Sequence, residues 1–211
     1  MTELKKRIDE FRSDLGKIEP ENIFHKHLLA SRSPVLKAEQ ERDIVFEIAK
    51  SFDTPVTSVF LVGSAKLGFR MLGKEEDQRR NIPARDQFSV FDDYSDIDVA
   101  IISQSLFQSY WRKVHAYYAG GGFRHFSSWS HDDPAQKFTY YLMHGWIRPD
   151  ALPATSNYDL RGDWVQKVDR VDNLRIAQAK VKVGLYFDAK FLTNYQVTSI
   201  NKCKAILETR K

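Results

Sequence analysis

The sequence predicts an α+β fold in which helices cover a small β-sheet. Three observations lead to this prediction. Apolar residues recur at helical spacing near both ends of the chain, two apolar runs rich in β-branched residues lie at 56–62 and 99–102, and residues 180–187 alternate apolar with polar side chains as a half-buried strand does. Because helical segments come before, between and after these strands, we expect them to pack on one sheet.

Length and composition indicate one soluble globular domain. A chain of 211 residues can bury a full core, and 42% hydrophobic with 28% charged residues is ordinary for such a domain. No apolar run has the length of a membrane span and the N-terminus lacks a signal-peptide core, so a cytoplasmic protein without a membrane partner is expected. The net charge of +4 is compatible with phosphate-bearing ligands and too small to indicate duplex DNA binding. The single cysteine, Cys203, excludes an internal disulfide and a cysteine-based zinc site.

Residues 1–55 are predicted to form a helical segment that packs on a core formed by residues 56–211, the whole being a single compact unit. Leu4, Ile8, Phe11 and Leu15 form a helical stripe over residues 3–16. A second helix is expected from 33 to about 52, because Ser33-Pro34 is typical of an N-cap followed by a proline in the first turn.

The centre of the chain is predicted to contain two strands separated by a long loop. The first strand, 56–62, ends at Gly63-Ser64 and turns into a short helix at 65–72. Residues 73–87 have no periodicity and are expected to form an exposed loop. The second strand opens with Asp96 and Asp98.

The remainder of the chain is predicted to be mainly helical. Helices are expected at 104–119, 135–146, 163–179 and 191–207, with a strand at 180–187. Residues 123–134 and 149–157 are expected to be connections. The strand periodicity places Lys182, Gly184 and Tyr186 on its non-core face.

Asp96 and Asp98 are the first candidate site residues. Residues i and i+2 of a strand point to the same face, so the two carboxylates are expected to lie side by side. Such a pair raises its own pKa values unless a cation neutralises it. Mg²⁺, for which Mn²⁺ can substitute, prefers oxygen ligands and often shares them with substrate phosphates. The pair therefore predicts a divalent-metal site.

Gly63 and Ser64 are the second candidate pair. A glycine after an apolar strand lets backbone N–H groups approach a phosphate closely, and Ser64 adds a hydroxyl donor. Lys66, two residues further on, either reaches the same phosphate or faces solvent. Residues 63–68 lack the lysine and hydroxyl residue that complete a P-loop, so that class of site is excluded. Phosphate donors near paired carboxylates predict a nucleotide-handling site.

Gly63-Ser64 after an apolar strand, followed by Ser-Asp-Ile-Asp-Val at residues 95–99, resembles the nucleotidyltransferase superfamily of the DNA polymerase β type. The resemblance covers residues 56–103 and implies a small mixed β-sheet. It implies that Asp96 and Asp98 bind Mg²⁺ and that Gly63 and Ser64 bind a nucleoside triphosphate, beside which Lys66 is a further candidate nucleotide-binding residue. The implied reaction transfers a nucleoside monophosphate to a hydroxyl of a protein, nucleotide or oligonucleotide and releases pyrophosphate. Some members of the superfamily act in phage defence. The resemblance therefore also suggests a role in a defence or toxin–antitoxin module, with a protein partner.

Two features depart from the pattern of this superfamily. Ser64 and Asp96 are 32 positions apart, so residues 70–91 look like an insertion. Four of its basic residues either contact phosphates or face solvent; these are Lys74, Arg79, Arg80 and Arg85. The superfamily also places a third carboxylate on a later strand. Asp188, at the end of the 180–187 strand, is the candidate, and Asp169 is the alternative if its segment is a strand.

Two other functions compete with nucleotidyl transfer. Without a third carboxylate, the chain could bind a nucleotide or a protein partner without chemistry. The aromatic residues of segment 107–129 could also stack on single-stranded nucleic acid, although their helical spacing favours a core role.

Overall fold

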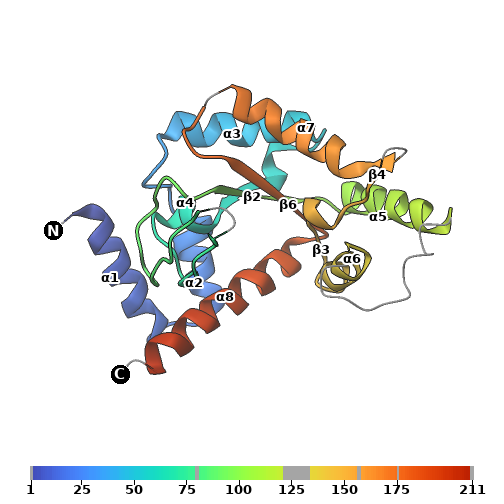
Figure 1. Cartoon of the computed structure of the whole chain (residues 1–211). Helices are drawn as coiled ribbons and strands as arrows, with labels where there is room; N and C mark the ends of the chain where they lie inside the picture. Colours follow the sequence, from blue (N-terminus) through green and yellow to red (C-terminus); the bar gives the residue numbers. More distant parts are fainter. Residues whose placement is uncertain (1, 79–80, 121–133, 156–157, 175, 210–211) are drawn as a thin grey trace.

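The computed structural model describes residues 2–78, 81–120, 134–155, 158–174 and 176–209. Its centre is a four-stranded sheet of order β1-β2-β6-β3 (Figure 1), so the predicted α+β class is confirmed. The strands are β1 (Val59–Val62), β2 (Ile97–Ile102), β6 (Val181–Tyr186) and β3 (Trp146–Ile147). β2 runs antiparallel to β1 and parallel to β6, while β3 runs antiparallel to β6. The sheet is therefore mixed.

One face of the sheet carries the larger apolar core. Alternate residues of the strands, such as Ile97, Val99 and Ile101, are almost fully buried against three helices. These are α3 (Ala38–Ser51), α5 (Gln104–Ala119) and α7 (Leu160–Asn173). Trp164 of α7 is 1% exposed and meets Phe52 and Tyr110 edge to face. The helical spacing of α5 thus reflects core packing, although Trp111 stays half exposed.

The opposite face is covered by elements from the two ends of the chain. α1 (Glu3–Leu15) and α2 (Pro20–Phe24) contribute Phe11 and Phe24, and α8 (Ala189–Thr209) contributes Ile200. In Figure 1 these helices lie on the other side of the sheet from α3 and α7. The N-terminal segment therefore packs on both faces, because α3 follows α1 and α2 in sequence yet covers the first face.

The N-terminal helices differ in extent from the prediction. α3 begins at Ala38 rather than at Ser33, because Ser33 Oγ accepts hydrogen bonds from Val35 N (3.2 Å) and Leu36 N (3.1 Å) in a separate turn. The same hydroxyl donates to Ala65 O at 2.6 Å. Residues 16–32 also contain α2 and a π-helical turn at His25–Leu29, neither of which was predicted.

The inserted segment is more ordered than the predicted loop. Isolated antiparallel bridges join Phe69 to Val90, Lys74 to Arg85 and Asp77 to Ile82. The segment therefore folds back on itself as an irregular hairpin beside α4 (Gly63–Leu67), which ends at Gly68 rather than at residue 72. Gly68 has a φ of +88°, a conformation that favours glycine.

The C-terminal half follows the predicted order with shifted ends. α6 (Pro134–Met143) stops before residue 146, where β3 begins, and α7 stops at Asn173 rather than at 179. β4 (Ala154–Thr155) lies in the connection expected at 149–157 and pairs with β5 (Tyr158–Asp159), which follows that connection. The predicted aromatic connection falls largely on residues 121–133, outside the described part. Across the described ranges, no helix combines the length and apolarity needed to cross a bilayer.

Candidate active site

Asp98 of β2, and Asp96 directly before this strand, lie on the face of the sheet opposite the larger core. Ile97 and Val99 point into the first core, so the intervening Asp98 points to the opposite face. Asp96, directly before the strand, is close enough for its charge to raise the pKa of Asp98. The two carboxylates are neighbours, as the strand period predicts.

The carboxyl of Asp98 has a raised pKa. Close packing around Asp98 desolvates it, and the charge of Asp96 adds to this effect, so that the pKa of Asp98 rises to about 6. Lys182, Arg70 and Lys74 act in the opposite direction and do not cancel the rise. Ionised Asp98 is thus short of compensating positive charge, which a bound cation would supply.

Asp98→Asn is expected to stabilise the metal-free protein at neutral pH. The folded pKa of about 6 lies above the ordinary 3.8, so stability conferred by Asp98 is complete below about pH 4 and is lost as the pH rises to about 6. At about 1.4 kcal/mol per pKa unit the limit is about 3 kcal/mol, and the remaining exposure of Asp98 reduces it to about 1–2 kcal/mol. Urea unfolding between about pH 4 and pH 8 measures this difference. A difference that does not change with pH would contradict the expectation.

Gly63 brings the backbone of α4 against Asp98. Gly63 has a φ of +68°, and a methyl group in place of its hydrogen would lie 2.6 Å from Asp98 Oδ2. Val62, the preceding residue, pairs with Asp98 in the ladder between β1 and β2. The structure therefore brings Gly63 together with Asp98, and Ser64, half-buried, follows in the first turn of α4. Only glycine fits this contact without displacing the carboxylate.

Lys66 does not have either of the positions predicted for it. Its side chain is buried and donates to Glu41 Oε1 of α3 at 2.5 Å. Because the fourth residue of the five-residue α4 turns toward α3, its ammonium faces the half-buried Glu41 carboxylate rather than solvent or the Asp96–Asp98 pair. Lys66 is thereby explained as a structural ion pair.

Lys182 joins the site from the neighbouring strand. In the parallel ladder between β2 and β6, Lys182 is the partner of Asp98. Its Nζ donates to Asp96 Oδ2 at 2.5 Å, and 53% of its side chain stays exposed. The later strand therefore places a lysine, and not a third acidic residue, beside the two carboxylates.

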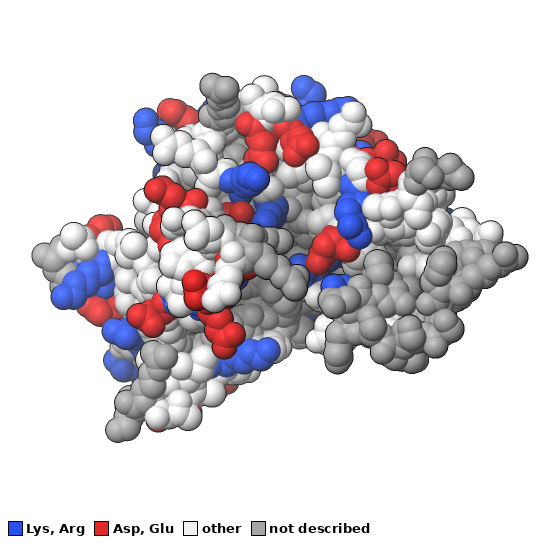
Figure 2. Space-filling view, viewed as in Figure 1, with Lys and Arg blue, Asp and Glu red and all other residues white. Residues whose placement is uncertain are grey.

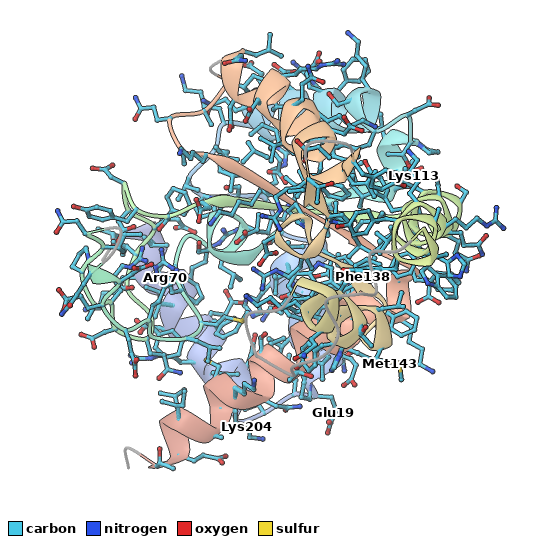
Figure 3. All side chains as sticks on the ribbon, turned by 45° about the vertical axis from the view of Figure 1, so that its right-hand side comes forward. Glu19, Arg70, Lys113, Phe138, Met143 and Lys204 are labelled. Atoms are coloured by element: carbon cyan, nitrogen blue, oxygen red, sulfur yellow. The ribbon has the colours of Figure 1, made fainter. Side chains whose placement is uncertain are left out.

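The inserted segment adds more positive charge. The charges of Asp96 and Asp98 act to raise the pKa of Arg70. The charge of Asp96 likewise acts to raise the pKa of Lys74, whereas that of Lys182 acts to lower it. Burial, followed by repulsion from Arg85, Lys182 and Arg70, lowers the pKa of Lys74. Figure 2 shows basic and acidic side chains close together near the middle of the face of the molecule that it displays. Figure 3 shows Arg70 within the inserted segment. The crowded cations favour an anionic ligand.

The cations of the insertion are oriented by the turn before β2. Asp92 accepts hydrogen bonds from Ser95 Oγ (2.7 Å) and Arg85 Nη1 (3.3 Å), and Ser95 Oγ accepts one from Arg70 Nη2 (2.7 Å). Arg70 Nε, Arg85 Nε and Arg85 Nη2 are buried and make no hydrogen bond among the described residues. Asp92 therefore belongs to a turn, as its sequence context predicted, and anchors both guanidinium groups.

Neither candidate for a third carboxylate lies with the pair. Lys182 pairs with Asp98 near the start of β6, whereas Asp188 follows the other end of that strand. Asp188 Oδ1 instead accepts from Lys190 N (2.8 Å) and Phe191 N (3.2 Å) at the start of α8. Asp169 lies within α7, not on a strand. Within the described ranges, no three acidic, histidine or cysteine residues gather as metal ligands. The structure thus brings neither residue to Asp96 and Asp98, because the strand period indicates the face of the sheet but not which end of β6 lies beside Asp98.

Aromatic side chains border the site on β3, β6 and α8. A methyl group on Gly184 would lie 2.7 Å from Trp146 Nε1, so this indole lies over β6 two residues beyond Lys182. Trp146 stacks on Tyr186 with centroids 5.6 Å apart and approaches Tyr195 at 4.7 Å. The charge of Asp98 contributes, after burial, to raising the pKa values of both tyrosines. Tyr195 is 42% exposed and offers a stacking surface beside the carboxylates.

The two carboxylates fit a hard divalent cation. Asp96 and Asp98 supply oxygen donors side by side, and burial together with the charge of Asp96 raises the pKa of Asp98, which a bound cation would counteract. Lys182 occupies one oxygen of Asp96 and must leave it if that oxygen binds metal. The donor set is thus suitable for Mg²⁺ with one internal competitor.

Sequence reasoning did not identify Lys182, Arg70 or Tyr195 as site residues. The alternation of residues 180–187 already placed Lys182 and Tyr186 on the face that carries Asp98, but their register against β2 was not accessible. Comparison of the chain with models of protein families, with curated proteins and with solved structures found no match.

Proposed function

We propose that the protein is a Mg²⁺-dependent nucleotidyltransferase that transfers a nucleoside monophosphate from an NTP or dNTP to a hydroxyl acceptor. The observation that carries the proposal is the contact of Gly63 with Asp98, which joins the glycine-serine turn to the paired carboxylates. The mixed sheet and the nearby cations of the insertion also support it. The finer assignment of the sheet to the nucleotidyltransferase type is part of this proposal.

Each residue has a role in the proposed reaction. Asp96 and Asp98 would hold Mg²⁺, which supplies charge neutralisation at the reacting phosphate when bound. Gly63 and Ser64 would donate to the triphosphate through backbone N–H groups and a hydroxyl. Arg70 and Lys74 would neutralise its remaining charge.

The transfer itself breaks a phosphoanhydride bond of the triphosphate and forms a phosphate ester bond to the acceptor. The acceptor oxygen forms a bond to the α-phosphorus as the bond from this atom to the bridging oxygen of the β-phosphate breaks. Pyrophosphate leaves, and the acceptor proton goes to solvent. The residues of this chain orient the triphosphate and balance its charge during this exchange.

A second function, nucleotide binding without transfer, is favoured by Lys182. The lysine stands where a third carboxylate was sought and neutralises Asp96 directly. A site with two carboxylates and several cations can hold a polyphosphate even if it does not transfer it. In that case the protein would act through a nucleotide-dependent contact with a partner.

Pyrophosphate release distinguishes the two functions. The protein is incubated with each labelled NTP and dNTP, Mg²⁺ or Mn²⁺, and in turn a protein, nucleotide or oligonucleotide acceptor. Transfer predicts pyrophosphate and a labelled product, both abolished by a chelator. Nucleotide binding without any product across this set would reject transfer and favour the second function.

A further inference from the structure

Lys182 forms an ion pair with one of the two carboxylates proposed to bind metal. Its Nζ contacts Asp96 Oδ2 at 2.5 Å, while its backbone pairs with Asp98. The two side chains of this ion pair are 53% and 29% exposed, so the lysine can leave without breaking a core contact. An exposed ion pair of this kind changes an equilibrium constant by at most about 5-fold.

The surroundings of Lys182 make its departure favourable only when an anion arrives. Without a ligand, Lys74 and Arg70 add positive charge near Lys182, which forms an ion pair with Asp96. A polyphosphate at these cations would offer Lys182 a second, more highly charged partner. The oxygen of Asp96 would then become free for a metal ion.

We propose that Lys182 is an internal counter-ion that occupies Asp96 until a nucleoside triphosphate draws it away, so that metal and nucleotide bind cooperatively. This inference rests on the metal site of the proposed function. Lys182 is a positioning residue: it weakens metal binding in the absence of nucleotide and strengthens nucleotide binding by following the phosphates. Coupling of two ligands through one residue must be reciprocal.

Lys182→Met is expected to change the two affinities in opposite directions. Mn²⁺ without nucleotide should bind up to about 5-fold more tightly, because Asp96 is no longer neutralised. ATP, or whichever triphosphate the transfer assay selects, should bind up to about 5-fold more weakly in EDTA, because one phosphate partner is lost. Titration calorimetry of the full chain measures both. A general loss of folding would weaken both ligands, so the opposite signs exclude it.

Lys180→Met is the matched control. Lys180 is exposed two residues earlier, and its removal changes net charge equally without touching the ion pair. Opposite shifts in Lys182→Met alone, with Lys180→Met and Lys182→Arg close to wild type, support the inference. Unchanged Mn²⁺ affinity in Lys182→Met, or the same shifts in Lys180→Met, overturns it while leaving the metal site standing. No Mn²⁺ binding by any variant overturns both the inference and the metal site.

Discussion

Asp98→Asn is expected to abolish nucleotidyl transfer, with turnover falling by at least about 100-fold. Asparagine keeps the shape of Asp98 but removes the charge that would hold Mg²⁺ beside Asp96. The same substitution is expected to stabilise the metal-free fold at neutral pH, because it relieves repulsion and desolvation of the carboxylate. Loss of turnover together with gain of stability separates a functional residue from a structural one. Pyrophosphate release and urea unfolding on the same preparation measure both.

Asp188→Ala is the control for this prediction. Asp188 lies past the far end of β6 and accepts hydrogen bonds from the first turn of α8. Its removal should cost about 1 kcal/mol of stability and leave turnover unchanged. If Asp188→Ala abolishes turnover in a folded protein, or if Asp98→Asn retains it, the assignment of the site is wrong.

Gly63→Ala is expected to damage both the fold and the site. Alanine at a φ of +68° costs about 1–2 kcal/mol, and its methyl group would displace Asp98 Oδ2, which lies 2.6 Å from the position of that methyl. A displacement of about 1 Å in a metal ligand is enough to reduce turnover by about 100-fold. Thermal unfolding and pyrophosphate release measure the two effects.

Gly16→Ala and a double mutant test the cause. Gly16 has a φ of −97°, and a methyl group there would meet nothing closer than 3.8 Å, so this substitution should be nearly neutral. In an Asp98→Ala background, Gly63→Ala should lose most of the part of its cost that comes from the carboxylate and retain the backbone part. Full additivity of the two substitutions would contradict a direct contact between them.

The local order of the chain could be predicted from sequence because it depends on short-range patterns. The stripes of α1 and α5, the apolar strand before Gly63 and the alternation of β6 each reflect a period within one element. The adjacency of Asp96 and Asp98 likewise follows from the strand repeat. The ends of elements were less predictable, since Ser33 caps a local turn rather than α3.

The side chains that complete the site required tertiary structure. Whether Lys182 or Asp188 lies beside Asp98 depends on the register of β6 against β2, and the long crossover between these strands contains no local signal for it. The position of the Lys66 side chain depends on α3, because its partner Glu41 lies on that helix, 25 positions away in sequence. Such pairings arise from packing of distant elements.

The sequence by itself therefore determined that a glycine-serine turn follows one strand and that two carboxylates share a face of another. Those features are set by backbone periods of two and by the conformational freedom of glycine. Only the tertiary structure decided that a lysine neutralises one of those carboxylates and that the insertion brings Arg70 and Lys74 toward them. Electrostatic balance at the site depends on distances between elements, and these are set by how the sheet and helices pack.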